Sequence, residues 1–210
     1  MKVYHGNILT VDANNTICEY LIEDKGRIVY VGSECPEEYA NAEKVELGKK
    51  ALLPSFVDTH QHFASFGIFH AGLNVMDITS NKEMIKAIKT FVESTDEKSL
   101  IAFGASPYSV KEGRLITREE IDSVCPDRPM MLVKYDGHAC VVNTPLLKKL
   151  EKKLSKLRGY HPESGEMNQE AFFAVSDYIS NSVSIPQMIR NMQKAVDYEA
   201  SKGIGMIHTV

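Results

Sequence analysis

Two histidines separated by one residue, His60 and His62, carry the clearest chemical signal in this sequence. They end an apolar run that begins at Leu52 and is punctuated by Pro54, which is typical of a buried β-strand. On a strand, side chains two positions apart point the same way, so Asp58, His60 and His62 are expected to share one face. Two neutral imidazoles on one face can bind a divalent ion such as Zn²⁺. The alternative interpretation is two polar residues where a strand meets a loop.

A second polar group follows the apolar segment 130–133, which reads as a buried strand. If that strand stays extended, Lys134, Asp136 and His138 lie on one face. Such groups need partners, because an unpaired buried charge is costly. A metal centre or a polar substrate would supply those partners, and a local hydrogen-bonded network is the alternative.

The elements that must position these residues follow from periodicity and turn signals. Residues 1–51 read as short strands separated by turns, and residues 63–77 read as a loop. Ser80 and Thr117, each followed three residues later by Glu, open two predicted helices. Strands alternating with helices after residue 51 predict an α/β fold with parallel strands. The further predicted strands are 100–105 and 205–210, and the further helices are 146–157, 169–179 and 186–202.

Composition sets the class of protein. A chain of 210 residues with 43% hydrophobic and 25% charged residues has the balance of a soluble globular protein. Its net charge of −4 and lack of a basic block argue against a nucleic-acid partner, and no segment is long enough to span a membrane. The N-terminus has no secretion signal, and four cysteines without Cys-x-x-Cys spacing predict free thiols in the cytoplasm.

Two segments carry a resemblance to a known family. The run from Pro54 to His62 resembles the first barrel strand of the amidohydrolase superfamily, close to Pro-Gly-Phe-Val-Asp-x-His-x-His, with Ser55 in place of Gly. The segment Asp136-Gly137-His138-Ala139, followed by Asn143, narrows the likeness to amidohydrolase family 3. The resemblance implies an N-terminal β-sandwich over residues 1–51. It also implies the first half of a (β/α)8 TIM-like barrel over residues 52–210.

The same resemblance implies roles for particular residues. His60 and His62 would hold one or two divalent ions, with Zn²⁺ the first candidate. His138 would contact the substrate, Asp136 would steady its loop, and His208 at the end of a fourth barrel strand is a further substrate contact. A satisfied core histidine is the alternative for His208, and a carboxylated Lys134 is a minor alternative for bridging two metal ions. The implied activity is metal-assisted hydrolysis of C–N bonds, of amide or imide type, in a small-molecule substrate.

The resemblance also implies residues that this chain does not contain. The family's remaining metal ligands and its catalytic aspartate lie on later strands, beyond Val210. We therefore expect an N-terminal fragment that is inactive alone, and that is unstable or pairs with a second copy as a homodimer. Gel filtration and thermal melting test that expectation. Two other functions stay open: a catalytically inactive binding module, and a deaminase or decarboxylase on the same scaffold, because fold does not fix chemistry.

Overall fold

The computed structural model describes residues 1–210. The chain forms two compact units. The first unit comprises Met1–Asp58 and Gly203–Ile207, and the second comprises Thr59–Lys202 and His208–Val210. The division between the two units falls inside strand β5 (Phe56–Gln61).

The first unit is built on a four-stranded sheet with the strand order β3-β2-β1-β4. The sequence predicts strands over residues 2–11, 16–23 and 27–31, and the structure confirms all three. Strand β1 pairs antiparallel with β2, and β2 pairs antiparallel with β3. A fourth strand, β4, pairs parallel with β1 and was not predicted, because its many charged residues hide the apolar alternation. The elements are β1 (Lys2–Leu9), β2 (Ile17–Asp24), β3 (Arg27–Gly32), the 3₁₀ turn Glu37–Tyr39 and β4 (Glu43–Leu52).

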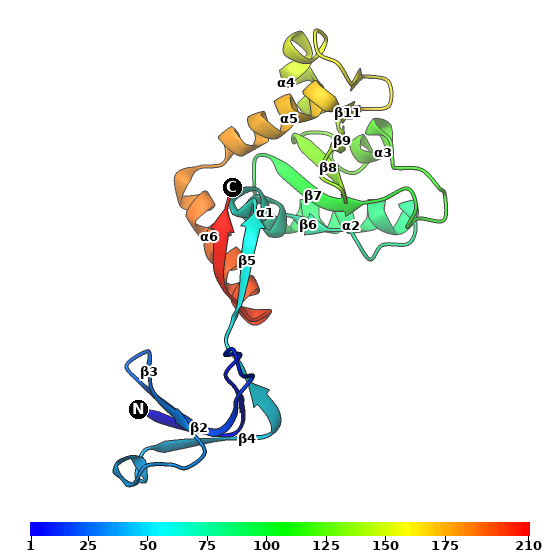
Figure 1. Ribbon diagram of the computed structural model, residues 1–210. Helices are drawn as coiled ribbons and strands as arrows, with labels where there is room; N and C mark the ends of the chain where they lie inside the picture. The colour runs from blue at the N-terminus through cyan, green and yellow to red at the C-terminus, as the bar shows by residue number, and fades with distance from the viewer. The chain divides into compact units, whose positions relative to one another are not determined.

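The second unit contains a mixed six-stranded sheet with the order β10-β11-β9-β8-β7-β6 (Figure 1). Strands β6, β7 and β8 are parallel, whereas β8–β9, β9–β11 and β11–β10 are antiparallel. The strands are β6 (Leu73–Asn74), β7 (Leu100–Ala105), β8 (Met130–Lys134), β9 (Ala139–Val142), β10 (Tyr160–His161) and β11 (Glu166–Asn168). Its helices are α1 (Phe63–Ala71), α2 (Asn81–Ser94), α3 (Arg118–Asp122), α4 (Thr144–Leu154), α5 (Gln169–Ser182) and α6 (Ile185–Ser201).

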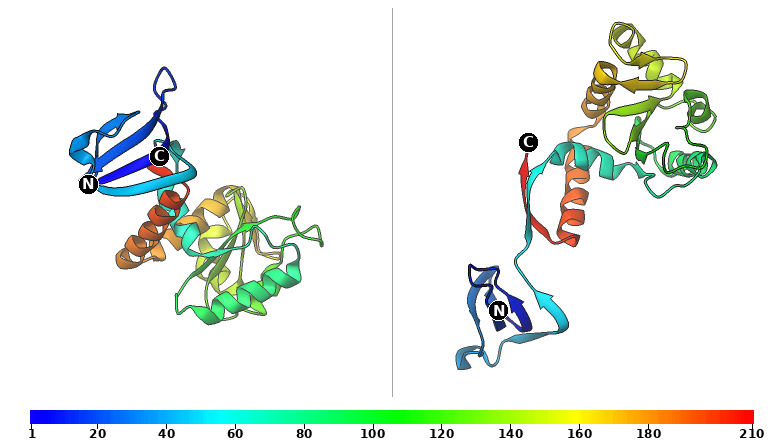
Figure 2. Two further views of the ribbon diagram at one scale, coloured as in Figure 1. Left: turned by 90° about the horizontal axis from the view of Figure 1, so that it is seen from below. Right: turned by 45° about the vertical axis from the view of Figure 1, so that its right-hand side comes forward.

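The centre of this sheet is buried on both faces. Successive residues of β8 alternate between two apolar clusters, so Leu132 packs with α2 and α3 while Met131 packs with α4 and α5. Ile88 of α2 and Leu154 of α4 are fully buried in the two clusters. Figure 2 shows α2 lying along the sheet. Burial on both faces explains why β8 reads as an uninterrupted apolar run.

Three details differ from the predictions. Residues 63–77 are not all loop, because Phe63–Ala71 form helix α1. The N-cap residue of this helix, His62, makes no side-chain capping hydrogen bond, so the sequence gives no start signal for it. The chain does not stay extended after β8 but reverses at Gly137, whose φ is +70°. The strands predicted for one parallel array lie in two sheets, with β7 and β8 in one and β5 and β12 (Ile204–Thr209) in another.

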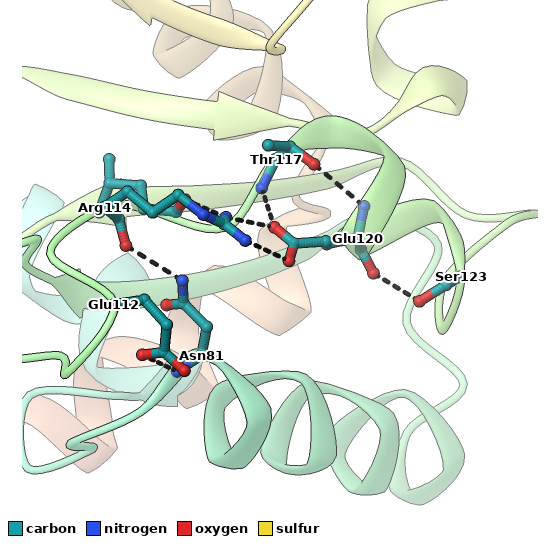
Figure 3. Close-up of polar contacts among 7 residues, drawn as sticks. Asn81, Glu112, Arg114, Thr117, Glu120 and Ser123 are labelled. Carbon is teal, nitrogen blue, oxygen red and sulfur yellow. Dashed lines mark hydrogen bonds and ion pairs between the residues drawn. The ribbon is translucent and has the colours of Figure 1, made fainter.

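Helix α3 begins with a complete capping box, as the sequence predicts (Figure 3). The Thr117 hydroxyl accepts a hydrogen bond from the Glu120 amide, and the Glu120 carboxylate accepts one from the Thr117 amide at 2.7 Å. Arg114 donates two hydrogen bonds to the same carboxylate, at 2.7 and 2.8 Å. The hydrogen bonds from Arg114 are the largest cause that lowers the pKa of Glu120 below its usual 4.5, and the Thr117 amide adds to the effect.

The substitution Glu120→Gln tests this cluster through pH. A carboxyl whose pKa is lower in the folded state stabilises the fold above its unfolded value, and that contribution is lost as pH falls through the folded pKa. We expect the variant to lose at most about 1 kcal/mol of unfolding free energy at pH 7, because the ion pair is partly exposed. The difference from the wild type should begin to shrink as pH falls below the usual pKa of 4.5, and it should vanish once pH is below the lowered pKa of the folded state. Urea unfolding at several pH values measures it, and a pH-independent difference would contradict the assignment.

Candidate metal and substrate site

The rings of His60 and His62 lie close together at the end of β5. Their centroids are 5.7 Å apart and their planes are nearly perpendicular, at 88°. Because an imidazole nitrogen binds zinc at about 2.0–2.1 Å, two rings that share one ion have centroids about 5–6 Å apart. Both histidines are exposed and accessible to an ion. The donor chemistry and the spacing therefore fit a shared divalent metal.

Two histidines do not complete a metal site. Catalytic zinc sites usually have three protein ligands, and structural sites have four. Across residues 1–210, no three side chains of His, Cys, Asp or Glu gather as a ligand group. The pair therefore fits part of a ligand set and not a complete one.

Strand β12 places His208 beside this pair. The amide of Phe56 donates to the Gly203 carbonyl, and the amide of Val210 donates to the Gln61 carbonyl. These two bonds give one parallel register, in which His60 lies opposite His208. Figure 2 shows the two strands side by side. Residues opposite each other in a parallel pair point to the same face, so the predicted substrate contact lies on the histidine face.

Asp136 and His138 occupy the tight turn between β8 and β9. The His138 amide donates to Asp136 Oδ1 at 3.1 Å, and His138 Nδ1 lies 2.6 Å from the Asp136 carbonyl oxygen. Since a carbonyl only accepts, Nδ1 is the donor in this contact, and the tautomer with the proton on Nδ1 leaves Nε2 as an acceptor. Lys134 lies 3.7 Å from Asp136 Oδ2 in an ion pair. The turn thus holds His138 in one tautomer, and the extended arrangement expected for these three residues is wrong.

Sequence reasoning missed the neighbouring loop after β7. Strands β7 and β8 are parallel neighbours, and the Tyr135 amide donates to the Ala105 carbonyl where they end. Tyr108 follows β7 and is 89% exposed, a rare state for a large aromatic side chain. Loops after parallel strands build the active sites of α/β folds. An aromatic residue just after a predicted strand end is the signal that would have marked Tyr108.

All four cysteines are free, as predicted. Cys140 lies near the candidate turn but is completely buried in β9. Burial strongly raises the pKa of its thiol, and burial likewise raises the pKa of Cys125. Cys140 is therefore a packing residue and not a nucleophile.

Thiol labelling checks this conclusion. In the folded protein at pH 8 we expect Cys140 and Cys125 to resist an alkylating reagent, because the reactive thiolate is suppressed by burial. Half-exposed Cys35 should react first, and all four thiols should react in urea. Mass spectrometry of tryptic peptides gives the order. Early modification of Cys140 in the native state would show that its strand opens.

The family model of the amidohydrolase family matches residues 43–204, and the chain belongs to that family. The match contains both segments on which the sequence resemblance rested, so that resemblance is confirmed. The chain is similar to the protein LONG AFTER FAR-RED 3 of Arabidopsis thaliana, with 28% identity over 151 residues. It is also similar to an N-substituted formamide deformylase of Arthrobacter pascens, with 27% identity over 155 residues.

The alignments cover most of this chain but only a part of each relative. Each alignment covers 70% of this chain, but only 26% of the Arabidopsis protein and 28% of the deformylase. An uncharacterized metal-dependent hydrolase from Pyrococcus horikoshii OT3 has a similar fold, with a TM-score of 0.74 and 19% identity. That similarity covers 100% of this chain and 42% of the hydrolase. The chain thus spans less than half the length of these relatives.

None of the helices in the structure combines the length and the apolar character needed to cross a lipid bilayer.

Proposed function

We propose that this chain supplies part of the active site of a metal-dependent hydrolase that cleaves C–N bonds of amide or imide type in small molecules. The observation that carries the proposal is the approach of the His60 and His62 rings to 5.7 Å at the end of β5. Membership of the amidohydrolase family supports it. The relative named as an N-substituted formamide deformylase supports an amide-type substrate.

Each candidate residue has a distinct task in this proposal. His60 and His62 would hold a divalent ion, Zn²⁺ by preference, since imidazole suits that metal. The bound ion would lower the pKa of its water to about 7 and polarise the scissile carbonyl. His138 would accept a hydrogen bond from the substrate through Nε2, because the Asp136 carbonyl keeps the proton on Nδ1. His208 would contact the substrate from β12.

We also propose that the intact protein completes a (β/α)8 barrel, in which residues 52–210 form the first half and residues 1–51 form part of a β-sandwich. The fold similarity to the Pyrococcus hydrolase over the whole of this chain supports this arrangement. In that barrel the histidines and the loops after β7 and β8 would lie at the carboxyl ends of the strands, where such enzymes carry their sites. The four free thiols support a reducing compartment such as the cytoplasm.

A metal-dependent substrate panel tests the activity. The intact protein would be stripped with a chelator, reloaded with Zn²⁺, Co²⁺ or Mn²⁺, and assayed against N-acyl, cyclic-imide and aminopurine compounds. We expect turnover of an N-acyl or imide compound that the chelator removes and metal restores. Turnover of aminopurines alone would mean that the protein is a deaminase and not an amide or imide hydrolase. Stoichiometric metal binding without any turnover would favour the inactive binding module.

A further inference from the structure

The residue between the two candidate ligands, Gln61, is tied to helix α6. Its Nε2 donates a hydrogen bond of 2.7 Å to Glu199 Oε1, across 138 positions of sequence. Glu199 lies near the end of α6 and is only 5% exposed, one of few polar side chains buried in this structure. A buried carboxylate is expensive unless donors satisfy it, so this bond holds the strand firmly against the helix.

The bond sets the direction of the neighbouring side chains. Successive residues of a strand point to opposite faces, so a Gln61 that faces α6 turns His60 and His62 away from the helix. The backbone at the same residue is held as well, because the Gln61 carbonyl accepts a hydrogen bond from the Val210 amide at 3.2 Å. The hydrogen bonds of the Gln61 side chain and main chain together fix the orientation of β5 about its own axis.

Helix α6 also holds the chain that follows His62. The first turn of α1 is closed by the bond from the Phe66 amide to the His62 carbonyl. Phe66 lies against Tyr198, with ring centroids 5.9 Å apart, and a Cβ added at Gly67 would lie 2.9 Å from the Met192 sulfur. Glu199 adjoins Tyr198 in α6, so one helix holds the chain on both sides of the second histidine.

We propose that Gln61 and Glu199 form a positioning pair that sets the orientation of the His60 and His62 rings toward a shared metal ion. This inference rests on the proposed function for the identity of the ligands. Partners that orient metal-binding histidines typically change metal affinity 10–100-fold when removed. Neither residue is among the proposed metal ligands or substrate contacts, so the pair acts through the direction of β5.

Substitutions in the intact protein test the pair through metal affinity. Gln61→Met keeps the size of the side chain but removes the donor, whereas Glu199→Gln keeps an acceptor oxygen for Gln61. We expect Co²⁺ affinity, measured by the absorption of the bound ion, to fall about 10–100-fold in Q61M. It should stay within about threefold of the wild type in E199Q. The matched control is Gln193→Ala, which breaks an exposed amide–carboxylate bond to Asp197 on the same helix.

Nuclear magnetic resonance of the metal-free protein supplies a second readout. The ring signals of His60 and His62 should shift in Q61M and stay in place in Q193A. If Q61M binds Co²⁺ as the wild type does, or if Q193A weakens binding equally, the positioning role is wrong while the metal site stands. If wild-type Co²⁺ binding does not depend on His60 or His62, the proposed function fails. In that case, ring shifts in Q61M would still support the orienting bond, and unshifted rings would overturn it.

Discussion

Replacing His60 and His62 together by alanine is expected to reduce the metal affinity of the intact protein at least about 100-fold and to abolish metal-dependent turnover. Loss of a single supporting group around a metal site already costs about 10–100-fold, and this change removes two ligands. The fold should survive, because both side chains are exposed and removing exposed side chains costs little stability. Calorimetric titration with Zn²⁺ measures the affinity, and thermal unfolding without metal checks the fold.

His161→Ala is the matched control for that substitution. His161 lies in the short strand β10, is exposed, and belongs to neither candidate group. The H161A variant should keep both metal affinity and turnover at the wild-type level. Equal loss of affinity in H161A and in the double variant would mean that metal binds histidines on the surface generally, and would remove the basis for the site.

Asn143→Leu is expected to lower the free energy of unfolding by about 3–5 kcal/mol. Asn143 is fully buried and joins three elements at the amino end of β8. Its amide nitrogen donates to the carbonyls of Cys125 and Arg128 at 2.8 and 2.7 Å. Its oxygen accepts from the amides of Met130 at 2.9 Å and Leu146 at 3.2 Å. Leucine fills the space but leaves these groups unsatisfied, at about 1–3 kcal/mol for each that water cannot reach.

Urea unfolding of the intact protein measures this loss, with Asn181→Ala as the control. Asn181 also donates to a carbonyl, that of Asp177 at 2.8 Å, but on the exposed surface of α5. Its replacement should change stability by no more than about 0.5 kcal/mol. A loss below about 1 kcal/mol in N143L would mean that water or a local rearrangement satisfies the freed groups.

The sequence predicts those parts of the fold that depend on neighbouring residues. The capping box of Thr117 and the N-terminal cap by Ser80 appear as expected, because a cap is made within four residues. Strand β4 and helix α1 were missed, since β4 is interrupted by charges and α1 has no cap. The division of the strands between two sheets depends on contacts across the whole chain, and no local pattern encodes it.

The candidate site shows the same limit. The proximity of His60 and His62 follows from their spacing on a strand, and the structure bears it out. The reversal after β8 was missed, although Gly137 marks a turn, because the apolar run before it favours a longer strand. The bond between Gln61 and Glu199 spans 138 positions and is visible only in three dimensions.

The two ends of β8 are expected to differ in how much substitution they tolerate. The aromatic residues just beyond the carboxyl ends of β7 and β8, Tyr108 and Tyr135, are 89% and 52% exposed, whereas the fully buried Asn143 joins elements at the other end of β8. Exposed positions tolerate exchange with little loss of stability. Substitutions beyond the carboxyl end of β8 are therefore expected to cost little stability, whereas substitutions of Asn143 at its amino end are expected to cost much more.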